Sequence, residues 1–288
     1  MRLSMDTSAV SLYYGDEEAL RIIRRAGFDC CDFSFCTLDG SVKIGENEAY
    51  LSWARHLRSV MDEIGLVCNQ AHAPLTLTRE NYSADMSDMH YRELVRSMEC
   101  ASVFGAPHIV VHPLGQEGGD SRDFDLRFYQ DLEKWCRRFK IKVAIENVYT
   151  VDPATGVKQR RLCSAEEQAA LVRALGTECF TVLIDIGHAA ILGSKPEDYL
   201  RRMDPALLGG LHVHDTDFRE DLHVPPYHAL HDWDAIMKTL GEMDYAGDLS
   251  LEIPYYISRF DRALVPVAVR FAEEIGRHLI DRFETLRR

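Results

Sequence analysis

Eight short apolar segments alternate with amphipathic helical patterns along the whole of this 288-residue chain. The segments have the length of buried strands, and the intervening stretches have the apolar spacing of helices. Repeats of this kind build a parallel sheet, because each helix returns the chain to begin the next strand. The expected strands are residues 3–7, 28–34, 66–72, 108–112, 142–147, 181–185, 209–215 and 249–253. Eight repeats predict a single (β/α)8 barrel, a TIM barrel of the α/β class.

Apolar residues at helical spacing, as in 50–64 and 91–101, predict helices that cover the barrel from outside. Five glycines follow such patterns and precede a strand, as glycines that end helices do. They are Gly27, Gly65, Gly105, Gly176 and Gly241. The irregular stretches 36–47, 113–122, 149–163 and 215–231 follow strand ends, where this fold carries its chemistry. No linker interrupts the pattern, so we expect residues 1–288 to form one domain.

The amino-acid composition argues against several classes of protein. A net charge of −13 argues against binding to nucleic acid, which normally uses a basic surface. The eight cysteines have no CxxC spacing, so free thiols in a reducing cytoplasm are expected. The N-terminus has no long apolar run, and no 18 apolar residues occur in succession, so no membrane segment is expected. The sequence does not fix the oligomeric state, and a homo-oligomer is one of the alternatives.

Six ionisable residues stand at the ends of six successive expected strands. They are His72, His112, Glu146, Asp185, His212 and Glu252. Their average separation is 36 residues, which is one eighth of the chain. Each repeat should therefore place one such group at the same mouth of the barrel. Unpaired charges are costly in this setting, whereas carboxylates and imidazoles together are suitable ligands for a divalent cation.

Each of these residues also has a structural alternative. The two glutamates could form buried salt bridges, and Asp185 could cap the helix that begins at IDIGHA. His212 could be a core histidine, and His72 and His112 lie near prolines and could fix loops. The occurrence of all six at one phase of the repeat favours a shared site.

Three further residues are expected near the same mouth. His188 lies three residues after Asp185 and could hold a substrate hydroxyl or a second cation. Asp221 and His223 form an Asp-x-His pair whose side chains point the same way in extended backbone, although a solvated loop is the alternative.

At these residues the chain resembles the xylose-isomerase-like barrel superfamily, which includes sugar and sugar-phosphate isomerases and epimerases and the endonuclease-IV-type nucleases. The matching segments, in order, are AHAPL, IVVHP, VAIENV, LIDIGHA, LHVHDTD, DLHVPP, DWDAI and LSLEIP. They span almost the whole chain. Trp233, in DWDAI, is expected to begin a helix.

The resemblance implies that Glu146, Asp185, His212 and Glu252 hold one manganese or zinc ion, with cobalt or magnesium as further candidates. It also implies that His188 binds substrate, together with His72 and His112. Arg219 corresponds approximately to an arginine of the family and is displaced by one residue. The family often has a glycine-rich stretch before DW, where this chain has YHALH.

For the nuclease branch, the resemblance implies three zinc ions. The matching positions are His72, His112, Glu146, Asp185, His188, His212, Asp221, His223 and Glu252. The acidic balance and the weakly basic stretch after His72 stand against a nuclease.

The expected reaction is proton transfer next to a carbonyl of a carbohydrate, through an enediolate stabilised by the metal. Glu146 and Glu252 would be the acid and base: action from opposite faces gives epimerisation, and one residue on one face gives aldose–ketose exchange. The alternatives are a zinc-dependent AP endonuclease or phosphodiesterase of the endonuclease IV type, and a non-catalytic sugar-binding barrel.

Overall fold

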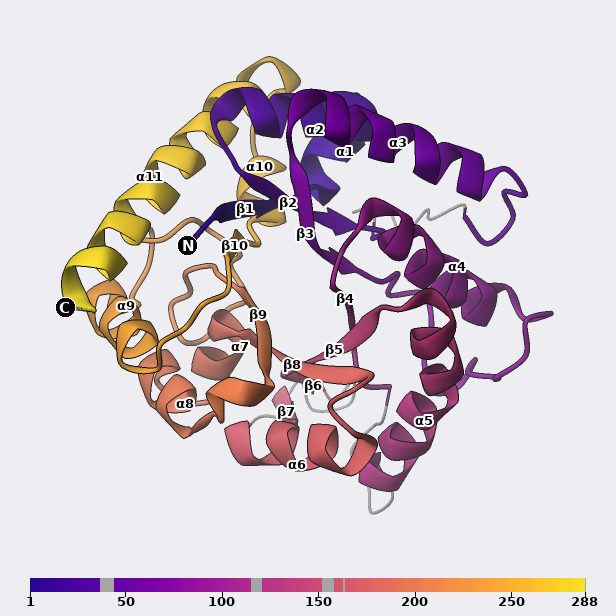
Figure 1. Ribbon diagram of the computed structural model, residues 1–288. Helices are drawn as coiled ribbons and strands as arrows, with labels where there is room; N and C mark the ends of the chain where they lie inside the picture. The colour runs from indigo at the N-terminus through magenta and orange to yellow at the C-terminus, as the bar shows by residue number, and fades with distance from the viewer. Residues whose placement is uncertain (37–43, 115–120, 152–157, 163, 288) are drawn as a thin grey trace.

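The computed structural model describes residues 1–36, 44–114, 121–151, 158–162 and 164–287. A ring of parallel strands forms its centre and helices surround the ring (Figure 1). The strands of the ring are β1 (Leu3–Asp6), β2 (Cys30–Ser34), β3 (Val67–His72), β4 (His108–Val111), β5 (Lys142–Glu146), β8 (Phe180–Asp185), β9 (Leu208–His212) and β10 (Leu249–Leu251). Each expected strand overlaps one of them, so the (β/α)8 barrel is confirmed.

The strands follow one another in the order β10-β1-β2-β3-β4-β5-β8-β9. The two ends of this sheet meet through a parallel bridge between Val213 and Leu251. Across it, the amide of Val213 donates to the carbonyl of Ser250 at 2.8 Å, and the amide of Glu252 donates to the carbonyl of Val213 at 3.1 Å. The barrel therefore closes beside Glu252, a residue expected at the site.

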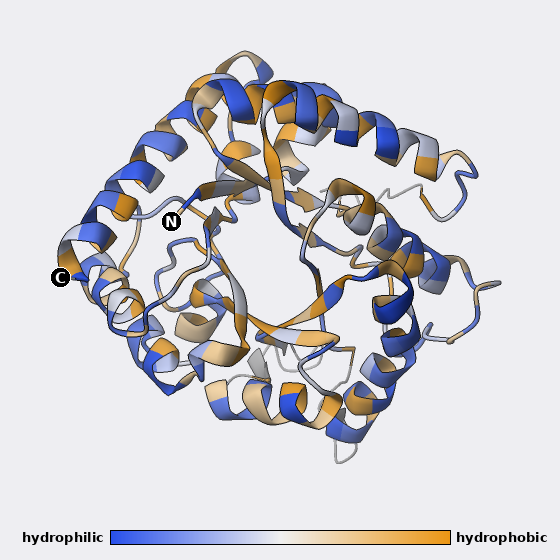
Figure 2. Ribbon diagram, viewed as in Figure 1, coloured by the Kyte–Doolittle hydropathy of each residue, from blue (hydrophilic) through white to orange (hydrophobic). Residues whose placement is uncertain are grey.

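The helices lie outside the ring, with their apolar sides against the strands (Figure 2). They are α1 (Ser8–Tyr14), α2 (Asp16–Ala26), α3 (Tyr50–Ile64), α4 (Met89–Phe104), α5 (Ser121–Phe139), α6 (Ala165–Leu175), α7 (Ile186–Ile191), α8 (Pro196–Arg202), α9 (Trp233–Glu242), α10 (Pro254–Ile257) and α11 (Val265–Leu286). Within the described ranges, no helix combines the length and the apolar content needed to cross a membrane.

Four of the five glycines expected to end helices do so, directly after α2, α3, α4 and α6. The prediction for Gly241 was wrong, since this residue lies inside α9. A Cβ at position 241 would lie only 2.6 Å from the Cβ of Arg287, so glycine is needed for close packing against the end of α11. Asp244 takes the left-handed backbone conformation after α9, with φ 52°.

The stretch 149–163 was expected to be an irregular loop, and this was wrong in part. Strands β6 (Val148–Val151) and β7 (Lys158–Arg161) pair antiparallel there, outside the main ring. Residues 152–157 and 163 of that stretch lie outside the described residues, as do 37–43 and 115–120 of two other expected loops.

Candidate metal and substrate site

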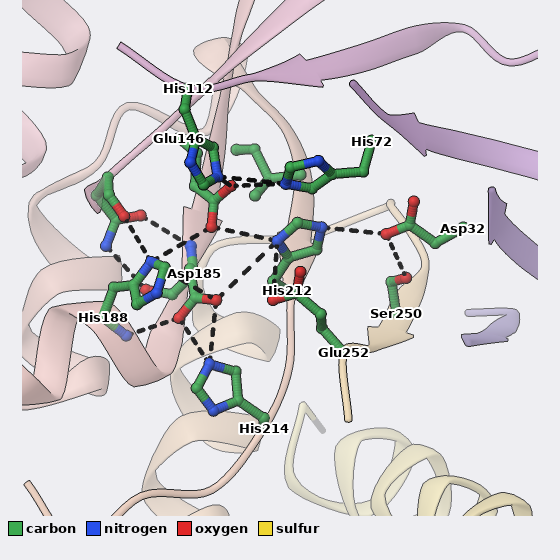
Figure 3. Close-up of polar contacts among 12 residues, drawn as sticks. Asp32, His72, His112, Glu146, Asp185, His188, His212, His214, Ser250 and Glu252 are labelled. Atoms are coloured by element: carbon green, nitrogen blue, oxygen red, sulfur yellow. Dashed lines mark hydrogen bonds and ion pairs between the residues drawn. The ribbon is translucent and has the colours of Figure 1, made fainter. Parts of the chain in front are cut away.

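The six ionisable residues expected at strand ends meet at one mouth of the barrel (Figure 3). Four of them are the last residues of β3, β5, β8 and β9, and the other two directly follow β4 and β10. Parallel strands end at the same edge of a ring, so residues far apart in sequence are brought together. Together with His188, Asp221 and His223, their side chains form the three clusters described next; a further group of potential ligands comprises His214, His223 and Glu252.

The central cluster comprises Glu146, Asp185, His212 and Glu252, whose potential ligand atoms all lie within 4.8 Å of one another. His212 Nδ1 lies 3.3 Å from Glu146 Oε1, 3.3 Å from Glu252 Oε2 and 4.0 Å from Asp185 Oδ2. All four residues are largely or wholly buried. Glu252 Oε2 is buried and has no hydrogen-bond partner among the described residues. This donor set fits a divalent cation.

A second cluster shares Glu146 with the first. His112 Nε2 lies 2.8 Å from Glu146 Oε2, and His72 Nε2 lies 3.2 Å from His112 Nε2 and 3.7 Å from Glu146 Oε2. His72 Nδ1 donates to the carbonyl of Ala73 at 2.8 Å, which leaves Nε2 facing the cluster. His72 and His112 therefore do more than fix loops, because both imidazoles face the central carboxylate.

The third cluster comprises His188, Asp221 and His223. Asp221 Oδ2 lies 3.4 Å from His188 Nε2, and Asp221 Oδ1 lies 3.1 Å from His223 Nε2. His188 Nδ1 lies 3.3 Å from Glu146 Oε1, which connects this cluster to the central one. The solvated-loop alternative for Asp221 and His223 is wrong: His223 is buried, and the side chain of Asp221 is only 21% exposed.

The loop that carries Asp221 and His223 is held by a buried carboxylate. Asp215 Oδ1 accepts hydrogen bonds from the amides of Thr216 and His231 at 2.9 and 3.0 Å. Its Oδ2 accepts from the amide of Ala229 and from Trp233 Nε1, at 3.1 and 3.0 Å. Asp215 thus fixes both ends of the loop against α9, which begins at Trp233 as expected.

Asp185 is both a helix cap and a member of the central cluster. It is the N-cap of α7, where its Oδ1 accepts from the amide of His188 at 2.6 Å. It also belongs to the central cluster, and both of its oxygens lie 3.1 Å from His214 Nε2. Gly187 makes room for that histidine, because a Cβ there would lie 2.0 Å from His214 Cε1.

The two glutamates of the central cluster have different electrostatic surroundings. Burial raises the pKa of Glu252 to about 7, although His212 and His223 oppose the shift. Burial would also raise the pKa of Glu146, but the imidazoles of His112 and His212 outweigh it and hold that pKa well below its usual range. Two carboxyls at one site with opposite shifts suit an acid and a base.

A cavity of about 350 Å³ opens above the clusters. Seven residues of the clusters line it: His72, His112, Glu146, His188, Asp221, His223 and Glu252. The remaining wall is formed by Asp6, Ser8, Ser34, Cys36, Leu75, Pro254 and Tyr255. The volume is at the lower end of the range of small-molecule sites. Arg219, expected to bind substrate, is exposed and lies outside this lining.

Two buried residues at the site were missed by the sequence analysis. Asp32, in β2, lies 3.1 Å from His212 Nε2 through its Oδ2. His214 contacts Asp185 as described above. His214 stands two residues after His212, and this period of two was an available signal for a shared face of a strand. Asp32 had a weaker signal, an acid inside the apolar run CCDFS.

Comparisons with known proteins agree with the barrel fold. The chain is 22% identical over 262 residues to y4fM, an uncharacterised protein of Sinorhizobium fredii, covering 83% of this chain and 81% of the relative. It is similar to the solved IOLI protein with a bound zinc atom, at 17% identity and a TM-score of 0.74, covering 98% and 99% of the two chains. It is also similar to D-psicose 3-epimerase in the presence of D-fructose, at 15% identity and a TM-score of 0.72, covering 97% and 99%.

The sequence pattern of a known family matches residues 20–275 of the chain, a range that contains every residue of the three clusters. The chain belongs to the family of xylose isomerase-like TIM barrels.

Proposed function

We propose that the protein is a divalent-metal-dependent isomerase or epimerase of a sugar or sugar phosphate. The observation that carries the proposal is the central cluster, in which four residues at strand ends each offer one ligand atom and these atoms all lie within 4.8 Å of one another. Glu146, Asp185, His212 and Glu252 would hold the ion, with manganese and zinc as the first candidates. A divalent ion held there supplies positive charge that stabilises an enediolate.

The acid and base of the proposed reaction are Glu146 and Glu252. They come from β5 and β10, which are not neighbours in the ring, so they approach the cavity from different sides. One glutamate removes the proton beside the substrate carbonyl and the other returns a proton. Delivery to the opposite face gives epimerisation, and return to the same face by one carboxylate gives aldose–ketose exchange.

The sugar substrate is supported by the cavity and by the similar structures. His72, His112 and His188 face the cavity and offer imidazole nitrogens to substrate hydroxyls. One similar structure is that of a D-psicose 3-epimerase, and another contains zinc. Arg219 is a further proposed substrate contact, although it is exposed and lies outside the cavity lining.

A second candidate is a zinc-dependent AP endonuclease or phosphodiesterase. The observation in its favour is that all nine positions expected for three zinc ions fall into three clusters: His72, His112 and Glu146; the central four; and His188, Asp221 and His223. The net charge of −13 stands against a nucleic-acid substrate. The same outer clusters can serve a sugar enzyme as hydroxyl-binding groups.

One set of assays tests both candidates. The purified protein is analysed for bound metals and incubated in D₂O with a panel of free and phosphorylated ketoses and aldoses. We expect interconversion, with deuterium entering the carbon next to the carbonyl. A chelator should remove the activity, and manganese, cobalt or zinc should restore it. Undiminished turnover by metal-free protein would contradict the metal scheme. Three metals per chain, with cleavage of an abasic duplex and no sugar conversion, would establish the second candidate.

A further inference from the structure

Asp32 is a buried carboxylate that points into the interior of the barrel (Figure 3). Its Oδ2 accepts hydrogen bonds from three directions. Gln70 Nε2 on β3 lies at 2.6 Å, His212 Nε2 on β9 at 3.1 Å and Ser250 Oγ on β10 at 3.4 Å. The side chain is 1% exposed, so no solvent replaces these partners.

The contact with Asp32 decides which nitrogen of His212 carries a proton. A carboxylate accepts hydrogen bonds and does not donate them, so His212 Nε2 must be the protonated nitrogen. His212 Nδ1 is then the nitrogen that can give up its proton and offer a lone pair to a cation, and it is this atom that lies 3.3 Å from both Glu146 Oε1 and Glu252 Oε2. The ring is also held in place by stacking on His72, with centroids 5.7 Å apart and planes 14° apart.

The buried carboxylate of Asp32 lowers the stability of the folded protein. Its Oδ1 is buried and has no hydrogen-bond partner among the described residues. A buried polar atom without a partner destabilises the folded state, and an apolar or smaller side chain at this position would avoid that cost. A role in stability alone therefore does not explain a carboxylate here.

We propose that Asp32 is a positioning residue that keeps His212 protonated at Nε2 and turned so that Nδ1 faces the central cluster. It thereby raises the affinity of that cluster for a divalent ion. The inference rests on the proposed metal role of His212. Carboxylates that orient metal-binding histidines in this way contribute roughly 10–100-fold to metal affinity in other proteins.

The test compares Asp32→Asn and Asp32→Leu with a matched control, Ser4→Ala. Ser4 is another buried polar residue of the ring, and its Oγ donates to Asn69 Oδ1 at 2.7 Å without touching the clusters. Affinity is measured by titrating metal-free protein with zinc in competition with a coloured chelator. We expect zinc binding to weaken roughly 10–100-fold in Asp32→Leu, less in Asp32→Asn, whose carbonyl still accepts from His212, and not in Ser4→Ala.

A second readout separates positioning from a merely structural effect. In the zinc-loaded protein, long-range ¹H–¹⁵N spectra of the histidines should show a protected Nε2 proton on His212. This signal should be kept in Ser4→Ala and lost or shifted in both Asp32 variants. Folded Asp32 variants with unchanged zinc affinity and an unchanged His212 signal would overturn the inference. If Asp32→Leu does not fold, the isosteric Asp32→Asn decides. Failure of the wild-type protein to bind zinc would instead defeat the proposed function.

Discussion

Glu146 connects the three clusters, because its two oxygens face different imidazoles. Oε1 lies 3.3 Å from both His212 and His188, and Oε2 lies 2.8 Å from His112. Glu252, in contrast, lies near the imidazoles of His212 and His223, at 3.3 and 3.5 Å from its Oε2. Both glutamates are therefore proposed to transfer protons, but Glu146 contacts residues of all three clusters and Glu252 does not.

This difference predicts different outcomes for the two amide substitutions. Glu146→Gln and Glu252→Gln should each lower turnover by about 10²–10⁴-fold or more, because each removes a proposed acid or base. Because Glu146 contacts residues of all three clusters, Glu146→Gln should also lower the total amount of metal bound per chain. Steady-state kinetics on a confirmed sugar, together with metal analysis, checks this. Wild-type rates in either folded variant would exclude that residue from proton transfer.

A second prediction concerns protons released on metal binding. Burial alone would lower the pKa of His212, but the carboxylates of Glu252 and Glu146 and the hydrogen bond to Asp32 outweigh it, and the pKa stands well above its usual value. The metal-free imidazole is therefore protonated near neutral pH, and a metal ion must displace the Nδ1 proton. Calorimetric titration in buffers of different ionisation enthalpy should show proton release, and metal affinity should increase with pH. Binding without proton release would contradict this.

The site residues at strand ends could be predicted from the sequence. Some of the residues that contact and orient them, such as Asp32, could not. His72, Glu146 and Asp185 interrupt apolar runs at a regular interval, which is visible without coordinates. The position of Asp32 depends on its contacts with strands β3, β9 and β10, which are remote in sequence. Only the closed ring brings these partners together.

At the scale of elements, the loop from Asp215 to His231 is the clearest case of local structure set by one side chain. Asp215→Ala would remove the acceptor of four hydrogen bonds in a buried position. We expect the free energy of unfolding to fall by roughly 2–4 kcal/mol, the range for loss of a buried charged hydrogen-bonding group. Chemical denaturation measures the loss.

The same substitution should loosen the loop before the barrel unfolds. Amide hydrogen exchange at Ala229 and His231 should speed up in Asp215→Ala, while amides in β4 and β5 keep their protection. Asp244→Gly, at a left-handed position outside the loop, is a matched control that should leave those loop amides unchanged. Unchanged exchange at Ala229 and His231 in the Asp215 variant would show that other contacts hold the loop.

The ring strands could be predicted because their composition and spacing agree, whereas β6 and β7 could not. VYTV and KQRR have too little apolar alternation to be recognised as strands. The error at Gly241 has a similar origin, since the close approach of α9 to Arg287 is a tertiary contact that local sequence does not reveal. Helix ends set by local glycine conformation were predicted correctly, and those set by packing were not.

At the scale of the whole molecule, the ionisable groups of the barrel are not confined to the mouth. His108 is the first residue of β4, at the opposite end from the clusters, and is 6% exposed. Its Nε2 has no hydrogen-bond partner among the described residues. Burial lowers its pKa from the usual 6.5 to about 4. At the end of the loop that begins at Asp215, burial likewise lowers the pKa of His231 to about 4.

Each of these two histidines should make a contribution to stability that is lost in mild acid. A histidine whose pKa is depressed in the folded state stays neutral there, while the unfolded chain takes up a proton below pH 6.5, so stability falls as the pH decreases from about 6.5 to about 4. For His108 alone the loss between pH 7 and pH 5 should be about 2 kcal/mol. Urea denaturation of wild type and His108→Leu at both pH values measures it. The variant should lose about that much less than wild type. Equal losses in wild type and His108→Leu would show that His108 is not a source of the acid sensitivity.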